Sequence, residues 1–154
     1  MTTPVYDSRP DTLAHINRVR DLLGKVDGIL LARAGNHDRS KLEEPEKSVF
    51  DACTLKLKTM PYGDPEYKAA LAELGPALAH HYAANRHHPE HFANGVDGMN
   101  LFDVIEMLMD WKAATERMKD GGDIRRSLTI NTGRFHLSPQ TAAILRNTIE
   151  YMGW

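Results

Sequence analysis

The adjacent pair His37-Asp38 has the clearest chemistry of any feature in this chain. It offers an imidazole nitrogen and a carboxylate oxygen from neighbouring residues, and divalent transition metals bind that mixture readily. His15 lies upstream of the pair, while a histidine-rich stretch and an acidic stretch lie downstream. Together these segments predict a metal site assembled from four separate parts of the chain.

The acidic stretch places three carboxylates on one face of a helix that is expected to begin after Asn100 and to run to about Lys119. Asp103, Glu106 and Asp110 follow the spacing i, i+3 and i+7, which brings their side chains to the same side. Asp103 also suits the first turn of a capped helix, where the helix dipole favours an acid. Asp110 has no such explanation, so it is the preferred ligand and Asp103 a second choice.

The histidine-rich stretch follows a helical pattern as well. His81 and His88 continue the apolar stripe of Leu78 at helical spacing, and His80 lies about 100° away from that stripe. His81 and His88 are therefore the first choices as ligands, with His80 and His87 as second choices. Histidines also occur at helix ends without binding a metal, so both interpretations stay open.

The upstream candidates have structural alternatives of their own. His15 shares a face with apolar residues of an amphipathic helix and can be a core histidine. His37 can form a local hydrogen bond, and Asp38 can cap the helix that follows it. We favour the metal site because imidazoles and acids lie in register on separate segments.

The composition is that of an ordinary globular protein. The chain has 154 residues, of which 42% are hydrophobic and 26% charged, and its net charge is −2. This balance gives no strong signal for nucleic-acid binding. The single cysteine, Cys53, excludes an internal disulfide, and no apolar run approaches the roughly 20 residues that a membrane span needs. We expect a cytoplasmic protein that does not bind membranes, and the sequence leaves its oligomeric state open.

The expected fold is all-α, because segments of helical periodicity alternate with turn signals and strand patterns are few. We expect a single domain over residues 1–154 with about six helices in a bundle. Residues 1–10 are expected to form an extended tail, and residues 123–154 an irregular segment to 137 followed by a helix. Helix boundaries are expected at or near Gly24, Gly35, Glu44, Asp64, Gly75, Asn100, Gly121 and Ser138.

The order of the candidate ligands resembles that of the HD-domain superfamily of metal-dependent phosphohydrolases. Those helical proteins use a histidine, a His-Asp pair and a distant aspartate, which correspond here to His15, His37-Asp38 and Asp110. The family's Gly-Tyr-Pro signature for cyclic dinucleotide hydrolysis is missing. Three stretches, 36–42, 85–91 and 106–111, are also similar to an uncharacterised family common in phages and bacteria, which supplies no activity.

A branch of the HD superfamily binds two metal ions and adds two histidines between these positions. His81 and His88 stand in the right order for that role. The resemblance then implies that Asp38 bridges the two ions. One or two divalent transition-metal ions are expected, and the mixed ligands suit Mn, Fe, Co, Ni or Zn without choosing among them.

The resemblance implies hydrolysis of a nucleotide or another small phosphate ester by metal-activated water. Three residues near the ligands are the catalytic candidates: Lys41 and Arg39 would hold a phosphate, and Glu106 would orient an imidazole. Two alternatives remain. The same kind of ligands occurs in HD-type di-iron oxygenases, and a non-catalytic phage-type protein that binds or modulates a partner would use the helices as a surface.

Overall fold

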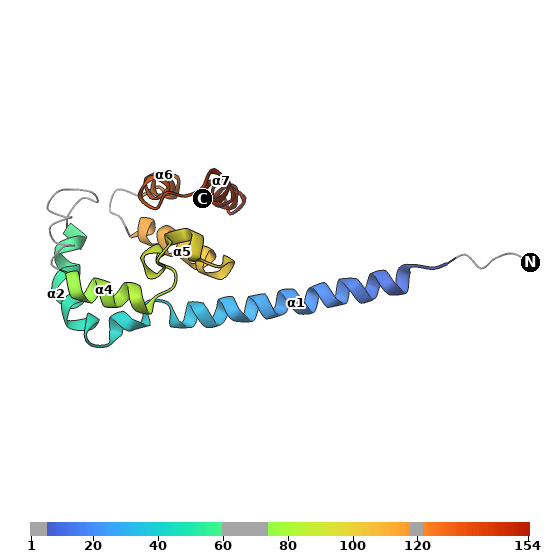
Figure 1. Ribbon diagram of the computed structural model, residues 1–154, viewed down its shortest axis with the longest axis horizontal. Coiled ribbons are helices and arrows are strands. Elements are labelled where there is room, and N and C mark those ends of the chain that lie inside the picture. Colours follow the sequence, from blue (N-terminus) through green and yellow to red (C-terminus); the bar gives the residue numbers. More distant parts are fainter. Residues whose placement is uncertain (1–5, 60–73, 118–121) are drawn as a thin grey trace, which may run out of the picture. The chain divides into compact units, whose positions relative to one another are not determined.

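The computed structural model describes residues 6–59, 74–117 and 122–154, and every regular element in these ranges is helical (Figure 1). The α-helices are α1 (Arg9–Asn36), α2 (Glu46–Thr59), α4 (Gly75–Ala84), α5 (Leu101–Glu116), α6 (Ile124–Arg134) and α7 (Pro139–Tyr151). Three short 3₁₀-helices are η1 (Arg39–Leu42), η2 (Pro89–His91) and η3 (Gly95–Gly98). The predictions of an all-α fold and of about six helices are confirmed for these ranges.

The chain divides into two compact units, Met1–Asn36 and His37–Trp154. Two of the expected boundaries, at Asp64 and Gly121, lie outside the described residues. Within the described ranges, no helix combines the length and the apolar character that crossing a bilayer requires.

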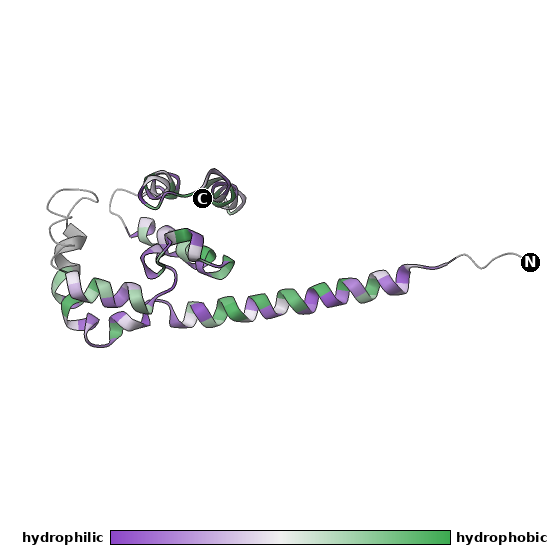
Figure 2. Cartoon of the chain, in the orientation of Figure 1, coloured by the Kyte–Doolittle hydropathy of each residue, from purple (hydrophilic) through white to green (hydrophobic). Residues whose placement is uncertain are grey.

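The first unit contains the single long helix α1 (Arg9–Asn36), and the expected break at Gly24 is wrong. Gly24 and Gly28 each cost about 1 kcal/mol relative to alanine within a helix, but they keep their backbone hydrogen bonds. No proline lies between Pro10 and Pro45 to interrupt the helix. Arg9 and Pro10, which were expected in an extended tail, already belong to α1, and residues 1–5 of that expected tail lie outside the described residues. Figure 2 shows apolar and polar residues alternating along all of α1, and none of its residues is buried.

The apolar core of the second unit lies among α5, α6 and α7. Its buried members are Met107, Leu108, Ile124, Leu128, Leu137, Ala142, Leu145 and Ile149. Trp111 on α5 stacks on Phe135, which follows α6, with ring centroids 6.1 Å apart. This core fixes α5, the helix that carries the acidic stretch.

The expectation of an irregular segment from 123 to 137 is wrong, because α6 occupies most of it. The side chain of Asp123 caps this helix by accepting a hydrogen bond from the backbone N–H of Arg125. The hydroxyls of Thr129 and Thr132 donate to carbonyls one turn earlier. These bonds satisfy the hydroxyl groups of the two β-branched threonines within the helix.

The other helix boundaries near the site agree with the sequence. Asn100 and Asp103 form a reciprocal capping box at the start of α5, and Ser138 caps α7. Pro45 precedes the first residue of α2, and Gly75 begins α4. The 3₁₀-helix η1 contacts both α2 and α4, and α4 contacts η2. These contacts bring the His37-Asp38 turn close to the histidine-rich stretch.

Candidate metal centre

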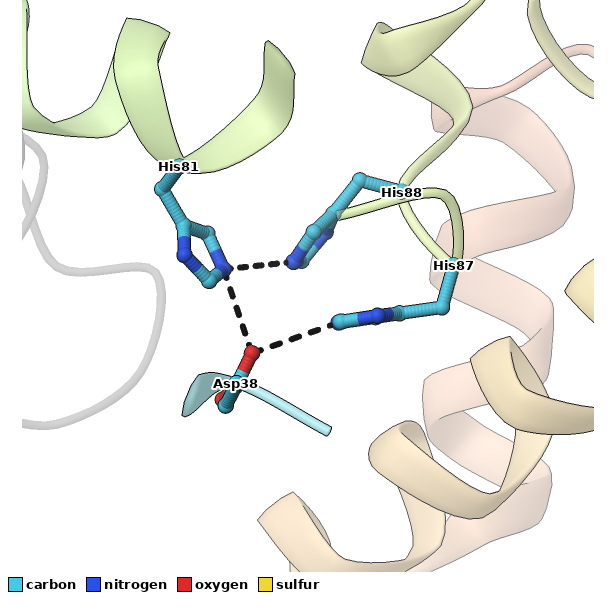
Figure 3. A group of neighbouring side chains, drawn as sticks. All are labelled: Asp38, His81, His87 and His88. Atoms are coloured by element: carbon cyan, nitrogen blue, oxygen red, sulfur yellow. Dashed lines mark hydrogen bonds and ion pairs between the residues drawn. The ribbon is translucent and has the colours of Figure 1, made fainter. Parts of the chain in front are cut away.

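Six imidazole and carboxylate side chains of the second unit form two overlapping groups. One group contains Asp38, His81, His87 and His88, and the other contains His37, His87 and Asp110. Within each group, one nitrogen or oxygen atom per residue lies within 4.8 Å of the corresponding atoms of the others. We call these six residues the polar centre. Figure 3 shows the first group, with its side chains pointing toward one another.

Asp38 enters the polar centre from a turn with a left-handed backbone, at φ 56° and ψ 14°. Aspartate is among the non-glycine residues that most readily adopt this conformation. Asp38 occupies the cap position of η1, but its side chain makes no capping hydrogen bond. Its Oδ2 accepts a hydrogen bond from Lys41 Nζ at 2.6 Å instead. The alternative that its carboxylate serves to cap the next helix is therefore wrong.

His81 lies in the last turn of α4, whereas His87 and His88 follow the end of that helix. Asn85 is already extended, at φ −120° and ψ 108°, so helical phase could not rank the two later histidines. His87 was a second choice, yet it is only 2% exposed and belongs to both groups. In the sequence, Pro89 indicated that the helix ends before His88, because a helix seldom continues through the residue before a proline.

Glu106 on α5 orients two of the imidazoles. Its Oε1 lies 2.9 Å from Nδ1 of His37 and 3.1 Å from Nδ1 of His87. An ionised carboxylate only accepts hydrogen bonds, so the Nδ1 that faces it carries the hydrogen. In a neutral His87 the lone pair is then on Nε2, on the opposite side of the ring. The orienting role expected for Glu106 agrees with these contacts.

Two acceptor atoms face each other in the interior of the polar centre. Asp38 Oδ1 lies 3.4 Å from His87 Nε2 and 3.3 Å from His81 Nε2 (Figure 3). Within the described residues, Asp38 Oδ1 and His87 Nε2 are buried without a hydrogen-bond partner. Buried polar atoms in this state cost free energy. A cation placed between them would satisfy both, so the donor set fits a metal ion.

The carboxyl groups of the polar centre favour the ionised state. Burial tends to raise the pKa of Asp38, but its charged and polar neighbours, the Lys41 ammonium group among them, outweigh burial and lower that pKa. Burial likewise opposes ionisation of Asp110, and the neighbouring His37 outweighs it and lowers the pKa of Asp110. Both side chains can therefore present negative oxygen atoms to a cation.

The imidazoles of His37 and His88 respond in opposite ways. Asp110 and Glu106 raise the pKa of His37 to about 9, against the effect of burial. Burial, reinforced by the proximity of His87, lowers the pKa of His88 to about 3. The metal-free centre thus holds a proton on His37, while His88 stays neutral at pH 7 with one nitrogen lone pair available.

The two basic candidates differ in position. Lys41 contacts the carboxylate of Asp38, and its ammonium group lies 5.2 Å from the centroid of the Phe50 ring. The side chain of Arg39 is 68% exposed and its Nε is 4.0 Å from Glu43 Oε1. Lys41 is therefore at the polar centre, and Arg39 is an exposed cation of the same turn.

Two of the second-choice ligands lie outside both groups. Asp103 is fully buried, where it completes the capping box of α5 and accepts hydrogen bonds from Arg86 at 3.0 and 3.2 Å. The Nδ1 atom of His80 lies 2.7 Å from Glu46 Oε1. His15 lies on α1 in the other unit and is exposed, so its role as a ligand stays a prediction.

Glu46 is the residue near the centre that the sequence did not indicate. It is fully buried at the start of α2 and contacts His80, His81 and Ser40. An acid just after a proline at a helix start is usually explained by the helix dipole at the surface. Only the packing of α2 against α4 and η1 distinguishes Glu46 from such an acid.

A family model described as "Family of unknown function (DUF5662)" matches residues 5–151. No curated protein and no solved structure matches the chain.

Proposed function

The chain belongs to DUF5662, a family of unknown function, and we propose that it is a metal-dependent phosphohydrolase. The proposed substrate is a nucleotide or another small phosphate ester. The HD-like order of the ligand candidates supports this activity, and the contacts of the polar centre support the requirement for a metal.

The observation that carries the proposal is the pair of buried acceptors at the polar centre. Asp38 Oδ1 and His87 Nε2 lie 3.4 Å apart and lack hydrogen-bond partners among the described residues. An ionised Glu106, whose Oε1 lies 3.1 Å from His87 Nδ1, favours the hydrogen of His87 on that atom, on the far side of the ring. This arrangement is unfavourable for folding alone, because two electron-rich atoms are desolvated against each other. It is favourable when a cation lies between them.

Each residue of the polar centre has a definite part in this proposal. The imidazoles of His37, His81, His87 and His88 and the carboxylates of Asp38 and Asp110 hold one or two ions. The nitrogen and oxygen donors suit Mn, Fe, Co, Ni or Zn. A bound divalent ion supplies Lewis acidity toward a phosphoryl oxygen and lowers the pKa of water toward roughly 7.

Lys41 completes the site as a holder of the substrate. Its ammonium group lies at the polar centre, and its side chain is 33% exposed, so it can reach an anion that arrives from solvent. Lysine binds phosphate as a point charge and can exchange its contact with Asp38 for one with a phosphoryl oxygen. Arg39 is exposed on the same turn and would attract the anion at longer range.

The proposal is tested by metal analysis followed by an activity screen. The protein is stripped with a chelator, its metal content is measured, and Mn²⁺, Fe²⁺, Co²⁺, Ni²⁺ or Zn²⁺ is added back. Release of phosphate, or of nucleotide product, is followed with nucleoside mono- and triphosphates and with phosphodiesters. We expect turnover that depends on the metal and disappears in His87→Gln.

The matched control is Glu43→Gln, because Glu43 belongs to the same segment but its side chain is 72% exposed. This variant should keep wild-type turnover. If the protein binds metal and consumes oxygen but cleaves no ester, the proposal of a hydrolase is wrong and the protein is an oxygenase. A stripped protein that takes up none of the five metals would reject the proposal and leave a binding protein as the alternative.

A further inference from the structure

A second buried carboxylate, Glu46, lies behind His81 on the side away from the polar centre. Glu46 is the first residue of α2 and is fully buried. Its Oε2 lies 2.9 Å from His81 Nδ1, and its Oε1 lies 2.7 Å from His80 Nδ1. Ser40 Oγ donates a further hydrogen bond to Oε2 at 3.0 Å. Both oxygens of Glu46 are therefore engaged, and the carboxylate has a fixed orientation.

Glu46 is an acceptor in all of these contacts. A hydroxyl and two imidazole nitrogens surround its two oxygens, and each of these groups can donate a hydrogen bond to an ionised carboxylate. An ionised carboxylate has no hydrogen to donate. The hydrogen between Glu46 and His81 must then be on Nδ1 of His81.

This assignment determines what His81 presents to the polar centre. A neutral imidazole with its hydrogen on Nδ1 has its lone pair on Nε2. That atom lies 3.3 Å from Asp38 Oδ1 and 2.9 Å from His88 Nε2 (Figure 3). The opposite tautomer would direct an N–H into the centre and prevent His81 from binding an ion.

We infer that Glu46 is a positioning residue that fixes His81 as the Nδ1-protonated tautomer and so makes it a metal ligand. His80 holds the other oxygen of Glu46 from a half-exposed position and does not itself bind the ion. This role parallels that of Glu106 toward His87. The inference rests on the proposed function only where it states that His81 binds an ion. The tautomer of His81 is set by Glu46 in the metal-free protein too.

The first experiment measures the tautomer directly, by ¹⁵N NMR of the imidazole nitrogens in metal-free protein at pH 7.5. The spectrum of His81 is assigned by its loss in His81→Gln. We expect the Nδ1-protonated form in the wild type, and a mixture of both tautomers in Glu46→Gln, whose amide can donate as well as accept. A wild-type His81 protonated on Nε2 overturns the inference, whether or not the variant folds.

The second experiment measures Co²⁺ affinity by competition with a chelator. Removal of a carboxylate that orients a metal-binding histidine typically weakens binding by about 10–100-fold. We expect that loss in Glu46→Gln, with far-UV circular dichroism unchanged, and wild-type affinity in the control Glu43→Gln. Equal affinity in Glu46→Gln and the wild type overturns the inference.

The two experiments separate this inference from the proposed function. A wild-type protein that binds no Co²⁺ rejects the metal site, while the NMR spectrum still decides whether Glu46 fixes His81. Co²⁺ binding by the wild type together with the Nε2-protonated tautomer rejects the role of Glu46 alone.

Discussion

Helix α5 contributes to two regions whose interiors differ completely. Met107 and Leu108 are buried in the apolar core with α6 and α7. Glu106 and Asp110 contact the imidazoles of the polar centre. The core packs apolar side chains against one another, which removes hydrocarbon surface from water. The centre instead gathers carboxylates and imidazoles, which lose hydration on burial.

The difference concerns whether each region is satisfied by protein groups alone. The apolar core stabilises the fold by itself, because apolar burial requires no partner beyond the protein. The polar centre leaves Asp38 Oδ1 and His87 Nε2 without hydrogen bonds among the described residues. We therefore propose that these side chains converge to bind an ion. Variants that affect one region and not the other test this distinction.

The largest effect is expected from Asp38→Asn. Asparagine tolerates the left-handed backbone at this position and keeps the side-chain size, but it removes the charge that both groups of imidazoles face. We expect Mn²⁺ or Co²⁺ affinity to fall by more than about 100-fold, beyond the usual cost of losing an orienting partner. Isothermal titration calorimetry measures the affinity, and circular dichroism checks the fold. Unchanged affinity would remove Asp38 from the ligands.

The apolar core is tested by Ile149→Ala. Ile149 is 0% exposed, and truncation of a buried isoleucine costs about 2–5 kcal/mol of unfolding free energy. Urea denaturation measures that loss. Because Ile149 belongs to the core cluster and to neither ligand group, the metal affinity of the folded variant should equal that of the wild type. A coupled loss of affinity would show that the two regions are not independent.

Metal addition to the wild-type protein should stabilise it and should act locally. An ion that binds only the folded state at about 100 times its Kd adds about 2.7 kcal/mol. Hydrogen exchange should show the added protection mainly in residues 37–42 and 81–88, and less in α7. Chelation should reverse both effects. Equal protection across the second unit would mean that the ion acts on global stability alone.

A smaller effect is expected from Asn100→Ala, which removes the cap of α5 without touching the polar centre. Loss of such a cap costs about 1 kcal/mol. The unfolding midpoint should fall accordingly, and metal affinity should change by less than a factor of about 5, which corresponds to about 1 kcal/mol. A larger loss of affinity would show that the start of α5 helps to position Glu106 and Asp110.

The sequence predicted the features that depend on local chemistry. Helix boundaries were expected near Glu44, Asn100 and Ser138, because a few neighbouring residues decide each of them. Five residues of the polar centre (His37, Asp38, His81, His88 and Asp110) were first choices from residue types and order, whereas His87 was a second choice and His15 stays a prediction. Gly24 was overestimated as a helix breaker, since glycine weakens a helix without removing its hydrogen bonds.

The remaining features depend on tertiary contacts. His87 follows the end of α4, so helical spacing could not show that it belongs to both ligand groups. Glu46 resembles a surface acid until α2 packs against α4 and η1. The helix α6 combines β-branched and polar residues, and its buried face forms only against α5 and α7. These contacts join residues that are distant in sequence, and no local pattern predicts them.

The most direct test of the metal centre is X-ray absorption spectroscopy of the protein loaded with one equivalent of Co²⁺. The account predicts a shell of nitrogen and oxygen donors with the multiple-scattering signal of at least three imidazoles, and loss of imidazole signal in His87→Gln. A shell of oxygen atoms alone, unchanged in that variant, would contradict it.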